Sequence, residues 1–542
     1  MKPTGTWFKR TPLLSATSVA LAASLFAIAS AAQAQPESPP RNPFLADSNY
    51  SVVHGNPAQT DSTVDAGPVD SSRQLRPEEL RYHDLGMFNL LYLVSGKYAD
   101  GKRVIWTNGS QFMTKLDYDS FNVISSLRMP GTDHNDHLAH ENWLKVFDSN
   151  ADLQTKLAAA RQSGIPAASG VYTLLDKDNQ YVVGGNGFVR IYGDQIPGDR
   201  QSGVVVRAEW LQPKEITGTF MGMNMTYDGR IILATTDGYL VALSRDFKDV
   251  QSIRLPGATE EIPKQPKGVF WVRNGFAIDE KGGIYIASQN HLHKVVWNGE
   301  RFSTQEKDGA WSEPYSNSLG RGTGATPTLV GFGNDPDKLV ALTDGDKLMN
   351  VVAFWRDAIP ESWKQLDGTP SRRIAGMLPA NFGDPDLQAA QSEQSLATSG
   401  YGMFVVNNEP RNVPEAILNA PREKLLFIGY LSYLKEHAPV GGQKFEWDPK
   451  RKTLTSAWAN REISSPNSVP FVSTGSNMVY LSGARNDQWT LEAIDWTTGK
   501  SAFHYTLGGA RFNSFYSQPQ VDDQGRVMVS ALYGALRIQP KK

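Results

Sequence analysis

The sequence predicts an all-β protein that forms a single β-propeller of eight blades, with seven blades as the alternative. A unit of strand, polar turn, apolar strand, Gly-containing turn and third strand returns about every fifty residues, which is typical of propeller blades. The chain also contains 48 Gly and 32 Pro, which suits many short strands joined by turns. One closed ring therefore explains the length of the chain better than several separate domains.

Eight copies of the unit can be found along the chain. The clearest begin at Asn224, Asn274 and Ser517, where an Asp-Gly or similar turn precedes β-branched or alternating apolar residues. Looser copies begin near Met87, Val171, Thr326, Ser395 and Asn467. Because the copy at Ser395 is irregular, seven blades remain the alternative count. The last copy ends at Ile538 with no room for a fourth strand, so a segment near residues 80–90 is expected to supply it and close the ring.

The N-terminus has the pattern of a bacterial export signal. Basic residues precede an apolar run from Leu13 to Ala32, and Ala-Gln-Ala follows as a small-x-small cleavage site before Gln35. An uncleaved membrane anchor is the alternative for this run. We expect a signal peptide at 1–34, an extended leader or linker at 35–79 and the propeller domain at 80–542. The mature protein would then be periplasmic or secreted, with no membrane span.

The composition excludes several kinds of protein. The chain has no Cys, so disulfides, cysteine-ligated metals and thiol nucleophiles cannot occur. Lys and Arg total 54 against 56 Asp and Glu, which provides no basic field for nucleic acid. There is no G-x-S-x-G elbow, P-loop or H-E-x-x-H motif, so a conventional serine hydrolase, nucleotide enzyme or zinc protease is not supported.

Helices are expected only in insertions between blade units. Residues 136–162 carry apolar side chains at near-helical spacing, and further insertions fall at 375–394 and 410–444. His134, His137 and His140 open the first insertion beside two Asp residues. Residues three apart on a helix point in different directions, so all three His side chains cannot easily reach one metal ion. A solvated polar face is therefore the preferred interpretation, and a metal site is the alternative.

Residues 493–503, A-I-D-W-T-T-G-K-S-A-F, resemble the repeat of the quinoprotein dehydrogenases, A-x-D-x-x-T-G-K-x-x-W. That resemblance implies a propeller in which the last residue of the repeat, Phe503 here, docks on the next blade. Members of the family bind pyrroloquinoline quinone, and many carry a vicinal disulfide beside it. This chain cannot form that disulfide, so we do not expect the quinone cofactor.

A recurring Asn at or just before the first strand of a unit suggests a polar ring at the channel. Asn224, Asn274, Asn467 and Asn513 occupy such places, and Glu393 and Thr326 lie at comparable positions. Amide oxygens with one carboxylate form a donor set that Ca²⁺ accepts. The pattern is similar to the gluconolactonase, paraoxonase and strictosidine-synthase-like propellers, which implies that Asn224, Asn274, Glu393 and Asn467 hold Ca²⁺. The alternative is that the Asn side chains bond to backbone groups at turns.

Two His residues and one Arg complete the predicted site. His291 and His293 alternate on a predicted strand, so both point to one face and either could act as a general base. Arg411 could bind a substrate carboxylate, with Asn513 and Thr326 as further substrate-binding residues.

Three functions remain open from the sequence. The leading hypothesis is a calcium-assisted hydrolase that acts on an ester or lactone at the central channel. The alternatives are a non-catalytic propeller that binds a small ligand or another protein of the cell envelope, and a quinone-dependent dehydrogenase. Because propellers host all three, the fold alone does not decide between them.

Overall fold

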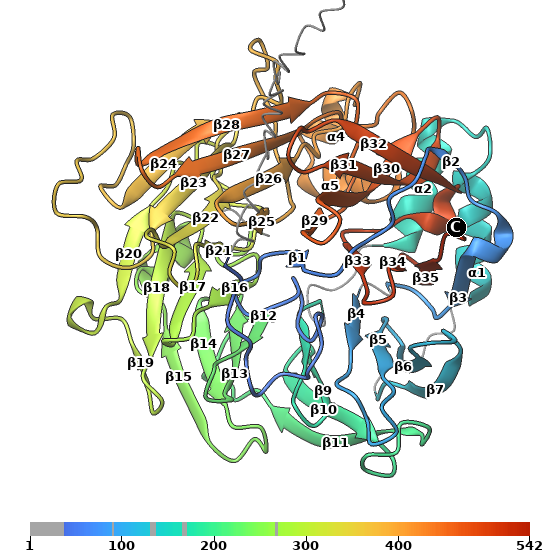
Figure 1. Ribbon diagram of the computed structural model, residues 1–542, viewed down its shortest axis with the longest axis horizontal. Coiled ribbons are helices and arrows are strands. Elements are labelled where there is room, and N and C mark those ends of the chain that lie inside the picture. The colour runs from blue at the N-terminus through green and yellow to red at the C-terminus, as the bar shows by residue number, and fades with distance from the viewer. Residues whose placement is uncertain (1–36, 89–90, 131–136, 165–170, 266–268, 542) are drawn as a thin grey trace, which may run out of the picture. The chain divides into compact units, whose positions relative to one another are not determined.

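The computed structural model describes residues 37–88, 91–130, 137–164, 171–265 and 269–541. The compact unit that begins at Glu37 contains eight β-sheets arranged around a common centre (Figure 1). The prediction of an eight-bladed propeller is confirmed. No helix within the described ranges is long and apolar enough to cross a membrane.

The first four blades follow the chain in order. Blade 1 contains β4 (Leu91–Val94), β5 (Val104–Asn108), β6 (Phe112–Asp117) and β7 (Val123–Arg128). Blade 2 contains β8 (Thr173–Leu175), β9 (Tyr181–Gly184), β10 (Phe188–Asp194) and β11 (Val204–Leu211). Blade 3 contains β12 (Phe220–Met225), β13 (Ile231–Thr235), β14 (Tyr239–Leu243) and β15 (Val250–Arg254). Blade 4 contains β16 (Phe276–Ile278), β17 (Gly283–Ala287), β18 (His291–Trp297), β19 (Phe302–Ser303) and β20 (Trp311–Pro314).

Of the remaining four blades, blades 7 and 8 also include strands from the N-terminal part of the chain. Blade 5 contains β21 (Thr328–Val330), β22 (Leu339–Thr343), β23 (Asn350–Trp355) and β24 (Ile374–Pro379). Blade 6 contains β25 (Ala397–Ser399), β26 (Gly402–Val406), β27 (Gly442–Asp448) and β28 (Thr453–Asn460). Blade 7 contains β29 (Phe471–Ser473), β30 (Met478–Arg485), β31 (Gln488–Asp495) and β32 (Ser501–Gly508), with β1 (Ser62–Thr63) and β2 (Arg73–Gln74) at its two edges. Blade 8 contains β33 (Pro519–Val521), β34 (Val527–Ala531) and β35 (Gly534–Ile538), completed by β3 (Leu80–Asp84).

Strand β3 closes the ring. It runs antiparallel to β35, with Leu80 opposite Ile538 and Asp84 opposite Gly534. Glu79, directly before β3, is buried and accepts hydrogen bonds from Arg73 at 2.7 and 2.9 Å and from the backbone N–H of Lys541 at 2.8 Å. The expected closing strand near residues 80–90 is therefore present, because an open fourth position in blade 8 would leave a sheet edge unpaired.

The apolar core lies between neighbouring blades, so the middle strands are covered on both faces. Strand β13 is buried along its whole length because blades 2 and 4 flank it. Ile232 of blade 3, for example, shares one cluster with Ile278 and Ile286 of blade 4. The Asp-Gly turn before β13 places Gly229 at φ +91°, a left-handed conformation that glycine adopts without strain.

Part of the segment expected to form an extended leader or linker lies at the centre of the ring, and it contains turns and bends. We call residues 50–63 the axial segment; β1 lies at its end, near the middle of the ring (Figure 1). Its backbone makes hydrogen bonds of 2.7–3.3 Å to the innermost strands of blades 1, 2, 4, 5, 6 and 7. The bonded pairs are Tyr50–Val94, Val53–Thr173, Pro57–Ile278, Ala58–Leu329, Thr60–Thr398 and Asp61–Val472. The chain thus fills its own channel.

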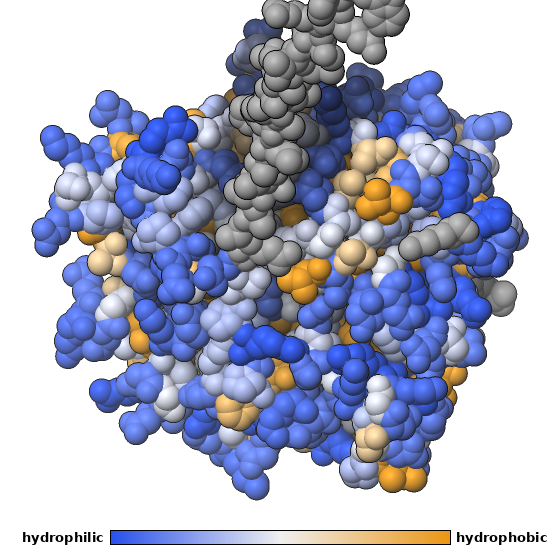
Figure 2. All heavy atoms as spheres, in the orientation of Figure 1, coloured by the Kyte–Doolittle hydropathy of each residue, from blue (hydrophilic) through white to orange (hydrophobic). Residues whose placement is uncertain are grey.

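Helices form in two of the three expected insertions; the described residues of the third, 375–394, contain no helix, and the first of them belong to β24. The first insertion forms α1 (His137–Phe147) and α2 (Leu153–Ser163), and the insertion after β26 forms α4 (Glu415–Leu418) and α5 (Pro421–Tyr430). A short α3 (Ala258–Glu261) precedes blade 4. The two insertions pack together: the rings of Phe147 and Tyr430 stack with centroids 5.4 Å apart. The viewed face of the protein is mostly hydrophilic, with small separate hydrophobic patches (Figure 2).

Candidate functional site

The residues just before the innermost strands of blades 2, 4, 5 and 6 lie together at one end of the ring, which we call the mouth. Tyr172 precedes β8 and its Oη lies 3.1 Å from Oγ1 of Thr326, which precedes β21. Arg273 precedes β16 and donates a hydrogen bond of 2.9 Å to Oε2 of Glu393, which precedes β25. Both members of this ion pair are partly exposed, with 26% of the Arg273 side chain and 34% of the Glu393 side chain accessible.

Two glycines bring these side chains close to one another. A Cβ on Gly275 would lie 2.5 Å from Cε1 of Tyr172, and a Cβ on Gly324 would lie 2.5 Å from the carbonyl oxygen of Ser392. Such distances are far below van der Waals contact, so only glycine allows the Tyr172 ring and the segment that carries Glu393 to approach. The mouth is therefore a packed set of side chains and not a loose collection of loop residues.

The axial segment contributes a His–Asp pair at this end of the ring. Nδ1 of His54 lies 2.9 and 2.8 Å from the two carboxylate oxygens of Asp61. The Asp61 side chain is fully buried, whereas 6% of the His54 side chain remains accessible. Burial raises the pKa of the Asp61 carboxyl, and the neighbouring His54 opposes that shift. Because Nδ1 is held by the carboxylate, Nε2 is the nitrogen available to a ligand. The His54 ring centroid is 6.1 Å from that of Tyr172.

The backbone around this pair is strained. His54, Gln59 and Asp61 have φ values of +63°, +60° and +51°, in the left-handed region that side chains other than glycine seldom adopt. Each such residue costs on the order of 1 kcal/mol or more. The hydrogen bonds from the axial segment to six blades hold it in this conformation, and strain that is held in this way is common at functional sites.

Polar atoms without protein partners lie near the mouth. Among the described residues, Oη of Tyr516 and both polar atoms of the Gln394 side chain are buried and make no hydrogen bond. Burial raises the pKa of Tyr516, and Glu393 adds to that shift while Arg273 opposes it. Buried polar groups of this kind need water or a ligand to complete their hydrogen bonding.

Comparison with known sequences reveals one full-length relationship. No family model matches the chain. An uncharacterized protein of Archaeoglobus fulgidus is 30% identical over 514 residues, which covers 92% of this chain and 89% of the archaeal protein. The chain belongs to the same family as this archaeal protein. The similarity extends over nearly the whole length of both family members, so it is not limited to a single blade.

Solved structures show what fold this family has. The quinohemoprotein alcohol dehydrogenase ADHIIG of Pseudomonas putida HK5 is similar with a TM-score of 0.51 and 13% identity, over 91% of this chain and 81% of that one. The quinohemoprotein alcohol dehydrogenase of Comamonas testosteroni has a TM-score of 0.49 and 11% identity, over 90% and 77% of the two chains. The resemblance to the propeller superfamily with quinoprotein-like repeats is confirmed at the level of fold.

Two residues at or near the mouth give no support for the quinone found in those dehydrogenases. Pyrroloquinoline quinone is a flat tricarboxylate, so its site needs unpaired cations and a broad aromatic face. Arg273 at the mouth is already paired with Glu393. Trp271, close to it in sequence, is buried between blades 3 and 4 with its Nε1 bonded to Glu261.

The recurring Asn residues connect neighbouring blades. The side-chain amide of Asn224 donates to the carbonyl oxygen of Phe276 in blade 4, and that of Asn274 to the carbonyl oxygen of Thr323 before blade 5. The amide of Asn467 donates to Oδ1 of Asn513, at the start of blade 8. Asn224 and Asn274 therefore bond to backbone groups, as in the alternative interpretation, but these groups belong to the neighbouring blade and not to the turn that carries the Asn.

The four residues expected to bind calcium have different surroundings. Asn224 is fully buried, and its oxygen already accepts from the backbone N–H of Met225. Glu393 faces Arg273, and Asn467 lies at a separate place beside the end of α5, where its amide also bonds to the carbonyl oxygen of Gly429. A calcium site formed by Asn224, Asn274, Glu393 and Asn467 stays a prediction, and their contacts give it no support.

His291 and His293, the two predicted general bases, lie on β18, which is the third strand of blade 4 counted from the axis. His293 is buried between the hydroxyls of Ser288 and Ser312, each 2.9 Å from a ring nitrogen. Burial, together with the nearby His291, lowers the pKa of His293 to about 3. His291 lies 3.6 Å from Glu261. The same-face prediction agrees with ring centroids 6.0 Å apart, but neither ring contacts the mouth residues described above.

The predicted substrate-binding residues separate into three places. Thr326 lies at the mouth, beside Tyr172. Asn513 is buried and donates to the carbonyl oxygen of Gly429 at the end of α5. Arg411 donates to the carbonyl oxygens of Ala438 and Lys435, at the edge of a cavity of about 1010 Å³ between the two helical insertions. The sequence indicated Thr326 at the mouth but gave no sign that His54 would join it, since His54 lies outside every repeat.

Proposed function

We propose that this exported propeller binds a small polar substrate at the mouth and hydrolyses an ester or lactone bond, with His54 as the general base. The observation that carries the proposal is the hydrogen-bonded His54–Asp61 pair beside Tyr172, at the end of the ring where the polar groups converge. Export rests on the apolar run and the Ala-Gln-Ala site at the N-terminus.

Asp61 would set the tautomer of His54. Its carboxylate accepts a hydrogen bond from the N–H at Nδ1 of His54. Nε2 therefore carries a lone pair and can remove a proton from a water molecule. The resulting hydroxide attacks the carbonyl carbon of the substrate, and the buried carboxylate stabilises the imidazolium that forms. The proton then passes from Nε2 to the leaving alkoxide, which restores the neutral ring and balances the reaction.

The other mouth residues would bind and polarise the substrate. The hydroxyls of Tyr172 and Thr326 are 3.1 Å apart, so one donates to the other and the second could donate a hydrogen bond to the carbonyl oxygen as it gains negative charge. Arg273, partly exposed beside Glu393, supports binding of a substrate with a polar or anionic group.

The proposal is tested by measuring the hydrolysis of a panel of aryl esters and lactones. The full chain is expressed, its N-terminus is left to processing by the host, and the purified protein is assayed. His54→Gln should lower kcat of the folded protein by about 100-fold or more, the usual contribution of a general base. Because the buried Asp61 loses its His54 partner, the melting temperature of the variant is measured as well and the assay is run where the variant is folded. Asp61→Asn should lower kcat as well, because the wrong tautomer of His54 is then favoured. His291→Gln is the matched control and should retain wild-type activity.

Two results would contradict the proposal. Full hydrolytic activity in His54→Gln would remove the base from the mechanism. Binding of the panel compounds without any turnover would favour the alternative, a propeller that binds ligands without catalysis. In either case, the mass of the purified chain would still report separately whether residues 1–34 had been removed.

A further inference from the structure

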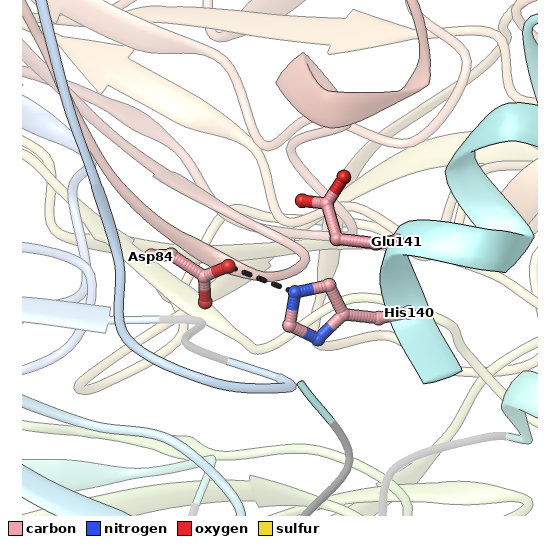
Figure 3. Close-up of side chains that lie close together, drawn as sticks. All are labelled: Asp84, His140 and Glu141. Atoms are coloured by element: carbon pink, nitrogen blue, oxygen red, sulfur yellow. Dashed lines mark hydrogen bonds and ion pairs between the residues drawn. The ribbon is translucent and has the colours of Figure 1, made fainter. Parts of the chain in front are cut away.

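A second cluster of ionisable side chains lies at the rim of the ring, where the closing strand meets the first helical insertion. Asp84 is the last residue of β3, and His140 and Glu141 lie in the first turns of α1. One ligand atom from each of the three lies within 4.8 Å of those from the others, and Nε2 of His140 is 2.8 Å from Oδ2 of Asp84 (Figure 3). In the described part of the chain, this is the one group of three or more such residues at metal-binding separation.

The imidazole of His140 is held in place by packing. Its side chain is fully buried, and its ring stacks on that of Tyr533 with centroids 4.6 Å apart and an angle of 24° between the planes. The Tyr533 hydroxyl lies 3.1 Å from Oγ of Ser163 on α2, which fixes the tyrosine in turn. A ligand whose orientation is already set loses little freedom when a metal binds.

The two carboxylates open the cluster to solvent. The side chain of Asp84 is 32% accessible and that of Glu141 is 40% accessible. Glu141 also accepts a hydrogen bond of 2.6 Å from Arg511. The hydroxyl of the neighbouring Tyr82 is buried without a hydrogen-bond partner among the described residues. Burial raises the pKa of Tyr82, and the nearby Asp84 and Glu141 add to that shift while Arg511 opposes it. The cluster therefore has a buried nitrogen side and an oxygen side that water can reach.

We propose that Asp84, His140 and Glu141 bind a divalent transition-metal ion of the zinc class. One imidazole nitrogen and two carboxylate oxygens suit such an ion, whereas Ca²⁺ and Mg²⁺ prefer oxygen ligands alone. The metal takes the place of the proton shared by His140 and Asp84. That proton is released to solvent, so the imidazole binds as a neutral ligand. Water completes the coordination on the exposed side, and Arg511 stays beside Glu141.

The site would connect two parts of the fold. It joins β3, which closes the ring, to α1, which belongs to an insertion, and these lie 56 residues apart in the sequence. An ion that binds the folded chain and not the unfolded one raises its stability. Since the mouth residues play no part in it, the metal proposal stands or falls independently of the proposed hydrolase.

The test is a titration of the full chain, first freed of metal with a chelator, using Zn²⁺ for calorimetry and Co²⁺ for visible absorption. One Zn²⁺ should bind per chain, with a rise in melting temperature, and Co²⁺ should develop absorption bands that report nitrogen and oxygen ligands. Asp84→Asn and His140→Ala should each lower the Zn²⁺ affinity by at least about tenfold, since even residues that only support metal ligands have effects of this size.

Glu423→Gln is the matched control. Glu423 forms a comparable partly exposed ion pair with Arg161 at 2.9 Å, so its loss should leave metal affinity unchanged. Because His140→Ala removes a buried ring, the near-isosteric Asp84→Asn keeps the test valid if the first variant folds poorly. Absence of stoichiometric binding, or equal affinity in wild type and Asp84→Asn, would overturn the proposal.

Discussion

Acidification should destabilise the protein through His293. The pKa of this ring is about 3 in the folded chain, because burial disfavours the charged form, against an ordinary value of 6.5. Below 6.5 the unfolded chain therefore binds a proton that the folded chain does not bind, and stability falls as the pH falls. At about pH 5, some 1.5 units below the ordinary value, this amounts to about 2 kcal/mol.

The measurement compares urea unfolding of wild type and His293→Gln at about pH 7 and about pH 5, followed by tryptophan fluorescence. The variant cannot titrate at this position, so its loss of stability on acidification should be smaller than that of wild type by about 2 kcal/mol. His291→Gln should keep most of the wild-type dependence, because burial is the larger cause of the shift. Equal pH dependence in wild type and His293→Gln would refute the assignment of His293 as a buried neutral ring.

Two further changes test how the ring is held together. Arg73 and Arg76 hold the pKa of Glu79 well below its usual range, so its contribution is present above about pH 4.3 and is lost on further acidification. Glu79→Gln should cost about 2 kcal/mol in urea unfolding near neutral pH and flatten the acid limb of the stability curve; an unchanged acid limb would contradict this. Asn224→Ala removes two hydrogen bonds to buried carbonyl groups and should lower the free energy of unfolding by about 3 kcal/mol, with or without a chelator. The control Asn150→Ala changes an exposed residue and should lower it by less than about 0.5 kcal/mol. A penalty for Asn224→Ala that disappears with the chelator would favour the calcium site instead.

The blades could be predicted because their information is local. Each unit carries its own turn residues and its own alternation of apolar side chains, as around the Asp-Gly turn at Gly229. The position of the closing strand also followed, since a ring whose last unit ends at Ile538 needs a strand from elsewhere. Both inferences needed only short sequence windows and the rule that sheet edges are paired.

The contents of the channel could not be predicted in the same way. The axial segment has no repeat and a composition typical of a linker, and its partners lie as far away as Val472. Recurrence of Asn correctly indicated positions near the axis, yet the choice between a metal and a carbonyl partner depends on distances that the sequence does not contain. His54 was missed for the same reason: only the folded chain brings it to Asp61 and Tyr172.

The axial segment makes formation of the ring and assembly of the mouth one event. His54 and Asp61 lie between residues whose backbones bond to six different blades, so the strained φ values at the pair persist only when those blades are in place. Variants that weaken the contact between the axial segment and the blades, such as Asn224→Ala, should therefore lose stability and catalytic rate together. His54→Gln should lower the catalytic rate of the folded protein directly, beyond any effect on stability. Only a site built from the axial segment predicts both patterns, because a site on the blades would tolerate movement at the centre of the ring.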